Sequence, residues 1–179
     1  AGHQMTGNQM TGNQMTGKVL FQFPGQGSQA VGMGGALADA FPVARAVFDE
    51  VNDALGEDLF ALMQTGPEED LRLTRNAQPA LFAASMAAVA VLKDATGKPV
   101  HEMAQFVAGH SLGEYSALAA AGTLAIGDAA RLLRLRGDSM QGAVPPGDGA
   151  MAAILGADEA IIDEIVVESA AEGVIQLAN

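Results

Sequence analysis

Residues 109–113 read Gly-His-Ser-Leu-Gly and match the pattern G-x-S-x-G, in which a serine lies between two glycines. This pattern places the serine at the apex of a sharp turn from a strand into a helix. The apolar run at 105–108 suits the strand, and the helix formers at 112–121 suit the helix. We therefore predict that Ser111 is a nucleophile at a helix N-terminus, where backbone N–H groups can stabilise an oxyanion. An ordinary glycine-rich connection is the alternative.

A nucleophilic serine is usually activated by a histidine within hydrogen-bonding reach. The chain has three histidines. His3 lies in an N-terminal repeat, and His101 follows Pro99 in a predicted loop. His110 is next to Ser111, where a tight turn directs neighbouring side chains apart, so it is a candidate pocket residue and a poor candidate base. We expect the general base to be absent from these 179 residues.

A second loop has the composition of a backbone anion site. Val19–Phe23 is a β-rich run, and Pro24-Gly25-Gln26-Gly27-Ser28-Gln29 follows it directly. Glycines on both sides of Gln26 permit a tight turn that exposes its N–H, as an oxyanion donor requires. A phosphate loop of the type G-x-x-x-x-G-K-[ST] is excluded because no Lys follows, and Ala30 breaks the pattern G-x-G-x-x-G. A strand-ending turn without chemistry is the alternative.

Four segments in order along the chain carry a resemblance to a known family. They are PGQGSQ from Pro24, NAQPALFA from Asn76, GHSLGEYSALAAAG from Gly109 and RLLRLRGDSMQ from Arg131. Together they resemble malonyl-CoA:acyl-carrier-protein transacylases and the related acyltransferase domains of polyketide and fatty-acid synthases. The resemblance runs from about residue 18 to residue 179.

The resemblance implies a role for each matching position. Ser111 corresponds to the nucleophile that carries the acyl group as an ester. The backbone N–H groups of Gln26 and Leu112 correspond to the oxyanion hole, and Arg136 corresponds to the arginine that pairs with the malonyl carboxylate. The family also has further substrate-binding positions that face the site. In this chain they are Gln78, His110, Met140 and Asn179.

Arg136 separates this chemistry from that of a simple esterase. A planar guanidinium can hold a carboxylate through two parallel hydrogen bonds and so fix a malonyl thioester over the serine, which an uncharged acyl group does not require. The alternative is a solvated arginine on an amphipathic helix, because Arg131, Arg134 and Arg136 lie within six residues.

The resemblance implies a cytoplasmic enzyme of fatty-acid synthesis that transfers malonyl from malonyl-CoA to the phosphopantetheine thiol of acyl carrier protein. Malonyl-CoA is then a substrate, no cofactor is bound permanently, and the complete protein is expected to be a monomer. The family's base histidine and an assisting glutamine lie downstream of the last residue here, so this chain alone is expected to lack a complete site. The alternatives are an acyltransferase domain of a polyketide synthase, an α/β serine esterase or thioesterase, and a non-catalytic fragment that binds carrier protein.

Composition excludes several other classes of protein. Apolar residues make up 49% of the chain, and the longest apolar stretch, 79–92, is shorter than the roughly 18 residues of a membrane span and is predicted to be a buried helix. The absence of cysteine excludes disulfides and thiolate zinc sites, and no His/carboxylate cluster has metal-ligand spacing. The net charge of −12 argues against nucleic acid and anionic membranes as partners.

The charge also conflicts with CoA and carrier protein as partners, because both are acidic. Residues 137–179 contain eight acidic residues and no Lys or Arg, so they form a poor surface for either. We expect Arg131 and Arg134 to supply a basic patch near the entrance of the site.

The predicted fold class is α/β, with a parallel-sheet, α/β-hydrolase-like large domain at 18–143 and an incomplete, ferredoxin-like small subdomain at 144–179. Residues 1–17 repeat the sequence QMTGN and are predicted to be an engineered tag or leader, with a natural low-complexity arm as the alternative. Hydrophobic patterns predict the elements of both parts. These are strands at 18–23 and 105–109, helices at 43–55, 78–95, 112–121 and 127–141, and, in the small part, a strand at 149–156, a helix at 158–171 and a strand from 173.

Overall fold

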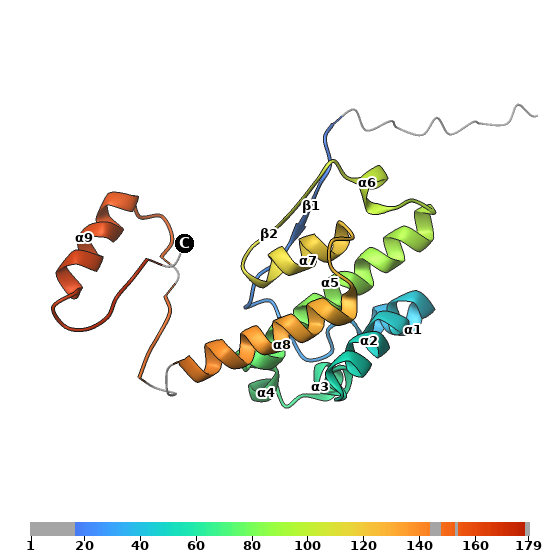
Figure 1. The fold of residues 1–179 in the computed structure, drawn as a ribbon, viewed down its shortest axis with the longest axis horizontal. Helices are drawn as coiled ribbons and strands as arrows, with labels where there is room; N and C mark the ends of the chain where they lie inside the picture. The colour runs from blue at the N-terminus through green and yellow to red at the C-terminus, as the bar shows by residue number, and fades with distance from the viewer. Residues whose placement is uncertain (1–16, 144–147, 153, 178–179) are drawn as a thin grey trace, which may run out of the picture. The chain divides into compact units, whose positions relative to one another are not determined.

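The computed structural model describes residues 17–143, 148–152 and 154–177 (Figure 1). The chain divides into two compact units, residues 1–143 and 144–179. The candidate chemistry that the structure describes lies in the first unit.

A two-stranded parallel sheet lies beside helix α7 in the first unit. Strand β1 spans Leu20–Phe23 and strand β2 spans Phe106–Gly109, with Leu20 opposite Phe106 and Phe23 opposite Gly109. The strands predicted at 18–23 and 105–109 are therefore confirmed. Because the strands are parallel and in this register, their carboxyl ends lie at the same end of the sheet, which brings the two glycine-containing loops together. Leu20 and Phe106, at the opposite end, are exposed.

The described part of the first unit also contains eight helices, most of which pack on one another rather than on the strands (Figure 1). They are α1 (Gly35–Ala40), α2 (Pro42–Leu55), α3 (Leu59–Thr65), α4 (Glu68–Arg72), α5 (Thr74–Thr96), α6 (Val100–Met103), α7 (Leu112–Ala120) and α8 (Ile126–Ala143). The helices predicted at 43–55, 78–95, 112–121 and 127–141 correspond to α2, α5, α7 and α8. The loop predicted around His101 is wrong, because that residue lies in α6. The single turn of α6 begins after Pro99, a favourable residue at a helix start.

Helix α5 is the core helix of this unit. By length and composition alone it could cross a membrane, but it packs against α2, α7 and α8 and buries residues on several sides. Phe82 of α5, Phe48 of α2 and Leu133 of α8 are fully buried side chains of this core. The prediction of a buried helix at 79–92 is thus confirmed over much of its length. Pro79 lies inside this helix.

Pro79 has a consequence for the backbone of α5. Proline has no N–H, so it cannot donate to the carbonyl four residues earlier, which here belongs to Arg75. The guanidinium of Arg134 supplies a donor instead, with Nη1 at 2.6 Å from the Arg75 oxygen. A side chain of α8 therefore completes the hydrogen bonding of α5.

The second unit contains helix α9 (Glu159–Ser169), which matches the helix predicted at 158–171. The strands predicted at 149–156 and from 173 are wrong for the residues that the structure describes there, none of which is assigned to a strand. A strand needs a hydrogen-bonded partner, and neither run pairs with another segment in the described residues. Their side chains lack packing too, since Leu155 is 90% and Val174 is 95% exposed.

Candidate active site

Ser111 lies at the turn between β2 and α7. Strand β2 ends at Gly109, and α7 begins at Leu112, immediately after the serine. Ser111 has φ 55° and ψ −114° and is the only non-glycine residue with positive φ in the part of the chain that the structure describes. This sparsely populated conformation is the one expected of a serine at the apex of such a turn, and its side chain is exposed rather than packed.

Two glycines make the turn possible by close backbone approach. A Cβ atom on Gly109 would overlap the carbonyl of Gly113. A Cβ atom on Gly113 would lie 2.5 Å from the carbonyl oxygen of Phe23 and 2.9 Å from that of Pro24. The spacing of the G-x-S-x-G pattern therefore reflects contact between the first turn of α7, strand β2 and the end of β1.

The loop after β1 lies beside this turn. A Cβ atom on Gly25 would lie 2.7 Å from Nδ1 of His110, so the imidazole of His110 is directed to this loop. Gln26 follows in the loop, and its side-chain Nε2 donates to Oγ1 of Thr74 at 3.2 Å. The N–H of Leu112, at the first position of α7, has no acceptor among the described residues. Both predicted oxyanion donors thus lie in segments that meet near Ser111, and the free N–H of Leu112 has the character that the role needs.

Arg136 reaches this turn from α8. Its Nη2 donates to Oγ of Ser111 at 3.0 Å, and its Nη1 donates to Oε1 of Gln78 at 2.6 Å. Gln78 is buried, and its Nε2 donates in turn to Sδ of Met140 at 3.3 Å. A continuous series of hydrogen bonds therefore joins four of the predicted site residues, from Ser111 to Met140.

Tyr115 is a site residue that the sequence did not reveal. It lies one turn into α7, and its ring centre is 6.0 Å from Cζ of Arg136. An aromatic ring at this distance attracts a cation electrostatically. Tyr115 thereby adds a second kind of contact that holds the guanidinium close to Ser111.

Helix α8 is held close to the start of α5, where Gln78 lies. A Cβ atom on Gly137 would lie 2.6 Å from Cα of Arg75 and 2.9 Å from the carbonyl oxygen of Thr74, so only glycine permits this approach. The next residue, Asp138, accepts a hydrogen bond from Nε of Arg75 at 2.6 Å. The two residues that follow Arg136 on α8 therefore both contact the start of α5, which fixes the position of Arg136.

The basic patch predicted from Arg131 and Arg134 is wrong for Arg134. The Arg134 side chain is only 12% exposed and forms an ion pair with Glu57. Burial lowers the pKa of this guanidinium, and the negative charge of Asp138 opposes the shift. Arg131, whose side chain is 56% exposed, is paired with Asp128 at 2.6 Å. Neither arginine therefore presents an uncompensated charge to an acidic partner.

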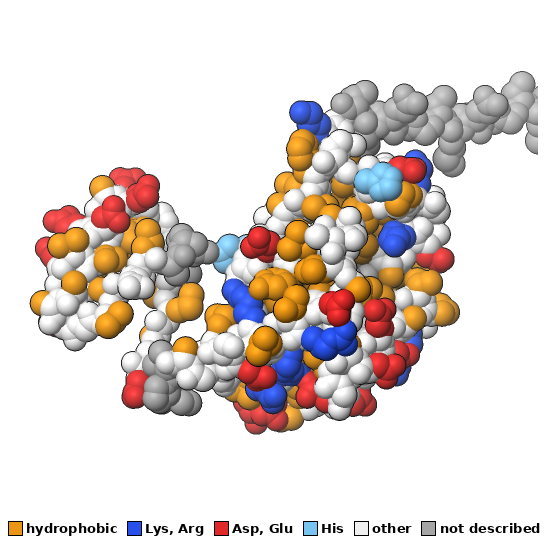
Figure 2. Space-filling view, viewed as in Figure 1, with side chains coloured by type: hydrophobic (Ala, Val, Ile, Leu, Met, Phe, Trp, Pro, Cys, Tyr) orange, Lys and Arg blue, Asp and Glu red, His pale blue; other side chains and the backbone are white. Residues whose placement is uncertain are grey.

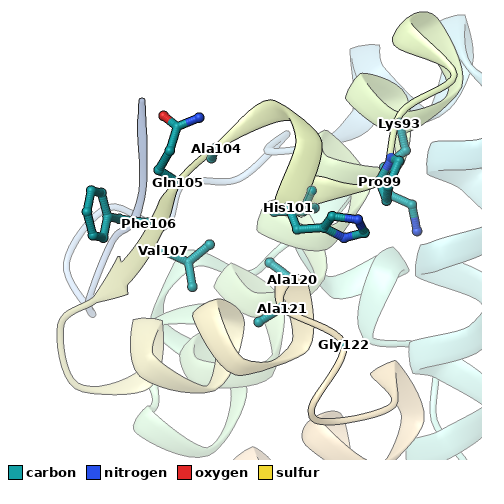
Figure 3. A pocket seen from close by; sticks show the side chains of 11 residues that line it. Lys93, Pro99, His101, Ala104, Gln105, Phe106, Val107, Ala120, Ala121 and Gly122 are labelled. Atoms are coloured by element: carbon teal, nitrogen blue, oxygen red, sulfur yellow. The ribbon is translucent and has the colours of Figure 1, made fainter. Parts of the chain in front are cut away.

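Other predicted residues lie apart from this arrangement. Asn179 and His3 lie outside the described residues. His101 lines a pocket of about 350 Å³ beside the beginning of β2 and the end of α7, away from the serine turn (Figure 3). Within the ranges that the structure describes, no group of three His, Cys, Asp or Glu side chains could hold a metal ion.

The site combines three groups of different chemistry. Ser111 has an exposed hydroxyl, the first N–H of α7 has no acceptor among the described residues, and Arg136 places a positive charge beside the hydroxyl. Blue side chains of Lys and Arg and orange hydrophobic side chains alternate over the visible face of the first unit, and no broad basic surface forms there (Figure 2). This local chemistry suits acyl transfer from a substrate that has a carboxylate near its reactive carbonyl.

Comparison with known proteins gives a consistent result. The model of a family described as acyl transferase domain matches residues 20–173. A malonyl CoA-acyl carrier protein transacylase of Escherichia coli strain K12 is 52% identical over 153 residues, which cover 86% of this chain and 48% of that protein. The chain spans about half the length of the curated relatives that it matches.

Solved structures give the same picture. An acyl-carrier-protein-S-malonyltransferase from Bartonella henselae is 54% identical, with a TM-score of 0.87 over 90% of this chain and 51% of that chain. A malonyl-transacylase in complex with its type II PKS acyl-carrier protein is 49% identical, with a TM-score of 0.81 over 88% of this chain and 50% of that chain. These similarities support an α/β fold with a parallel sheet and many helices.

Proposed function

The chain belongs to the acyl transferase domain family, and we propose that its complete protein transfers a malonyl group from malonyl-CoA to the phosphopantetheine thiol of acyl carrier protein in fatty-acid synthesis. The observation that carries this proposal is the hydrogen bond from Arg136 to Ser111. A malonyl ester has its carboxylate on the carbon next to the ester carbonyl. An arginine this close to the nucleophile can bind that carboxylate. An acetyl group has no carboxylate and does not need such an arginine.

The first step forms an ester on Ser111. Its Oγ attacks the thioester carbonyl, the C–O bond forms and the C–S bond breaks, and CoA leaves with the serine proton, which a base relays. The N–H groups of Gln26 and Leu112 stabilise the negative charge on the carbonyl oxygen in the intermediate. We assign the base to a histidine outside these 179 residues, because the His110 imidazole is directed to Gly25.

The second step returns the serine to its starting state. The phosphopantetheine thiol attacks the malonyl-serine carbonyl and loses its proton to the base, the C–S bond forms, and the C–O bond to Ser111 breaks as Oγ regains a proton. Arg136 exchanges its contact with Oγ for the malonyl carboxylate during both steps, while Gln78 and Tyr115 hold the guanidinium from two other sides. Water must be excluded from the ester, since its attack would release malonate.

Several finer assignments belong to the same proposal. The large unit has an α/β-hydrolase-like arrangement, supported by the serine turn. Of the ferredoxin-like subdomain predicted at 144–179, only helix α9 is present in the described residues. His110 and Met140 line the part of the site where the substrate binds. The enzyme is a cytoplasmic monomer without a permanently bound cofactor.

Transfer to the carrier protein of a polyketide synthase is the second candidate function. It is favoured by the similarity to a malonyl-transacylase that binds a type II PKS acyl-carrier protein. The chemistry at Ser111 and Arg136 is the same in both cases. Transfer rates to carrier proteins of the two kinds, measured side by side with one preparation of the complete protein, distinguish them.

The experiment that tests the proposal compares malonyl-CoA with acetyl-CoA, the same thioester without the carboxylate. We expect Arg136→Ala in the complete protein to lower kcat/KM for malonyl-CoA by about a hundredfold and to leave the rate with acetyl-CoA equal or higher. Arg131→Ala, on the same helix and exposed, is the matched control and should leave both unchanged.

Intact-protein mass spectrometry supplies the second part of the test. Wild-type protein should gain a malonyl adduct that Ser111→Ala lacks. An adduct on the alanine variant would require another nucleophile. Equal losses with both thioesters in Arg136→Ala would show that Arg136 does not bind the carboxylate. Release of free malonate with no transfer to carrier protein would identify an esterase instead.

A further inference from the structure

Arg134 lies two residues before Arg136 on α8, yet its guanidinium is turned into the protein. Nη1 donates to the carbonyl of Arg75 and to Oδ1 of Asn76, each at 2.6 Å, and the guanidinium also forms an ion pair with Glu57. These acceptors belong to the start of α5 and to the connection between α2 and α3. One side chain of α8 therefore joins two other segments of the fold.

The acceptors of Arg134 need a donor for reasons of their own. Pro79 has no N–H to donate to the Arg75 carbonyl, so this carbonyl has no helical partner four residues later. Asn76 is buried and uses its Nδ2 on the carbonyl of Asp70, which leaves Oδ1 to accept from Arg134. A buried acceptor without a donor is unfavourable. These acceptors of α5 are therefore satisfied only when α8 places Arg134 beside them.

Helices α5 and α8 also hold Gln78 and Arg136, and Arg136 contacts Ser111. Asn76 accepts from Arg134, and two residues later in each helix Gln78 accepts from Arg136. Gly137 and the ion pair of Asp138 with Arg75 follow directly on α8. Helices α5 and α8 lie side by side along this stretch (Figure 1). A shift of α8 along α5 would therefore move the Arg136 guanidinium relative to both Gln78 and Ser111.

We propose that Arg134 is a positioning residue for acyl-group selection, which fixes the register of α8 on α5 and so holds the Arg136 guanidinium at the place where the substrate carboxylate binds. This inference rests on the proposed malonyl transfer. Arg134 touches neither substrate nor Ser111 and acts through Arg136. Its loss is thus expected to affect substrates with a carboxylate more than substrates without one.

Arginine fits these acceptors better than lysine. Its planar guanidinium presents donors from two separate nitrogens, whereas the three donors of a lysine ammonium lie on one nitrogen at the end of a flexible stem. Arg134→Lys keeps the positive charge opposite Glu57 but disturbs the spacing of the donors to the Arg75 carbonyl, Asn76 and Glu57. The substitution therefore separates geometry from charge.

The test uses the complete protein and measures kcat/KM for malonyl-CoA and acetyl-CoA together with the thermal midpoint of unfolding. In Arg134→Lys we expect the malonyl value to fall by about ten- to a hundredfold and the acetyl value to change by less than about twofold, because a small displacement of a positioning group has effects of that size. Arg131→Lys, one turn earlier and exposed, is the matched control and should leave both values unchanged.

A second variant guards against a failure to fold. Glu57→Gln keeps Arg134 and its acceptors on α5 but removes the negative charge that helps to orient the guanidinium toward them, so it should lower the malonyl-to-acetyl ratio in the same direction but by less. An unchanged ratio in folded Arg134→Lys, or equal losses with both substrates, would overturn the positioning role. If wild-type protein itself gave no malonyl transfer, or if Arg136→Ala kept the wild-type ratio, the proposed function would fail instead.

Discussion

Nη2 of Arg136 donates to Oγ of Ser111 at 3.0 Å, across 25 residues of sequence. In the proposed reaction, a positive charge beside the hydroxyl would favour the negative charge that develops as the serine attacks. The contact occupies the position that a substrate carboxylate would take in the proposed reaction. The guanidinium thus has an acceptor before and after substrate binds, and the neighbouring Gln78 and Tyr115 limit how far it moves between the two.

The backbone conformation of Ser111 predicts an effect on stability. At φ 55° a non-glycine residue is strained, and glycine relieves that strain. We expect Ser111→Gly to raise the free energy of unfolding by about 1 kcal/mol relative to Ser111→Ala, with both variants free of acyl adduct. Urea unfolding of the two variants of the complete protein measures the difference. Equal stabilities would mean that the turn relaxes without cost.

Gly113 should tolerate no side chain. A Cβ atom there would lie 2.5 Å from the Phe23 carbonyl oxygen, and backbone atoms cannot move aside as a flexible side chain can. Gly113→Ala is expected to cost about 1–3 kcal/mol and to displace the Leu112 N–H, with a loss of acyl transfer. Gly142→Ala, in a helix with open space around it, is the matched control and should be neutral or stabilising by up to about 1 kcal/mol. Thermal unfolding and transfer assays check both, and a stable, active Gly113→Ala protein would contradict the close approach.

Gln78→Glu should convert a partner of Arg136 into a competitor of the substrate. The new carboxylate would lie where Oε1 now accepts from Nη1 at 2.6 Å and would repel the malonyl carboxylate. We expect kcat/KM for malonyl-CoA to fall at least about tenfold, with a much smaller effect for acetyl-CoA. Gln78→Met, similar in shape and uncharged, should cost less malonyl activity than Gln78→Glu. The opposite order of the two variants would mean that charge at this position is unimportant.

Ser116 of α7 is fully buried, and its hydroxyl has no hydrogen-bond partner among the described residues. Because an unsatisfied buried hydroxyl is unfavourable and alanine is the better helix former, Ser116→Ala should leave stability unchanged or raise it by about 1 kcal/mol. Ser85→Ala is the comparison, since that hydroxyl donates to the Leu81 carbonyl at 2.8 Å. A loss of stability in Ser116→Ala larger than in Ser85→Ala would reveal a partner for the Ser116 hydroxyl.

The sequence predicted those parts of the fold whose signals are local. The G-x-S-x-G pattern between an apolar run and a helix-forming run indicated β2, the turn and α7 correctly. The short helices α1, α3, α4 and α6 escaped, because a helix of one or two turns depends on what it packs against rather than on its own periodicity. In α3, for example, Leu59 and Met63 are buried in the common core, which a local pattern does not reveal.

Long-range contacts limited what could be said of the site. The segments around Gln78 and Arg136 could be identified by resemblance, but the distances that join them to Ser111 depend on how α8 packs on α5. Arg134 was predicted to form a basic patch with Arg131, whereas its side chain is only 12% exposed. Pro79 lies in the first turn of the helix predicted at 78–95, where proline removes no hydrogen bond. The Arg75 carbonyl needs another donor only because α5 begins earlier, at Thr74.

The two-stranded sheet affects how this chain behaves at high concentration. In the described part of the chain, β1 and β2 pair only with each other, so each strand leaves one side of its backbone without a neighbouring strand. Apolar side chains at Leu20 and Phe106 accompany these open edges. Such edges act as templates for further strands from other molecules. Preparations of these 179 residues by themselves are therefore prone to aggregation, and a charged substitution at Phe106 is the first change to make for solubility.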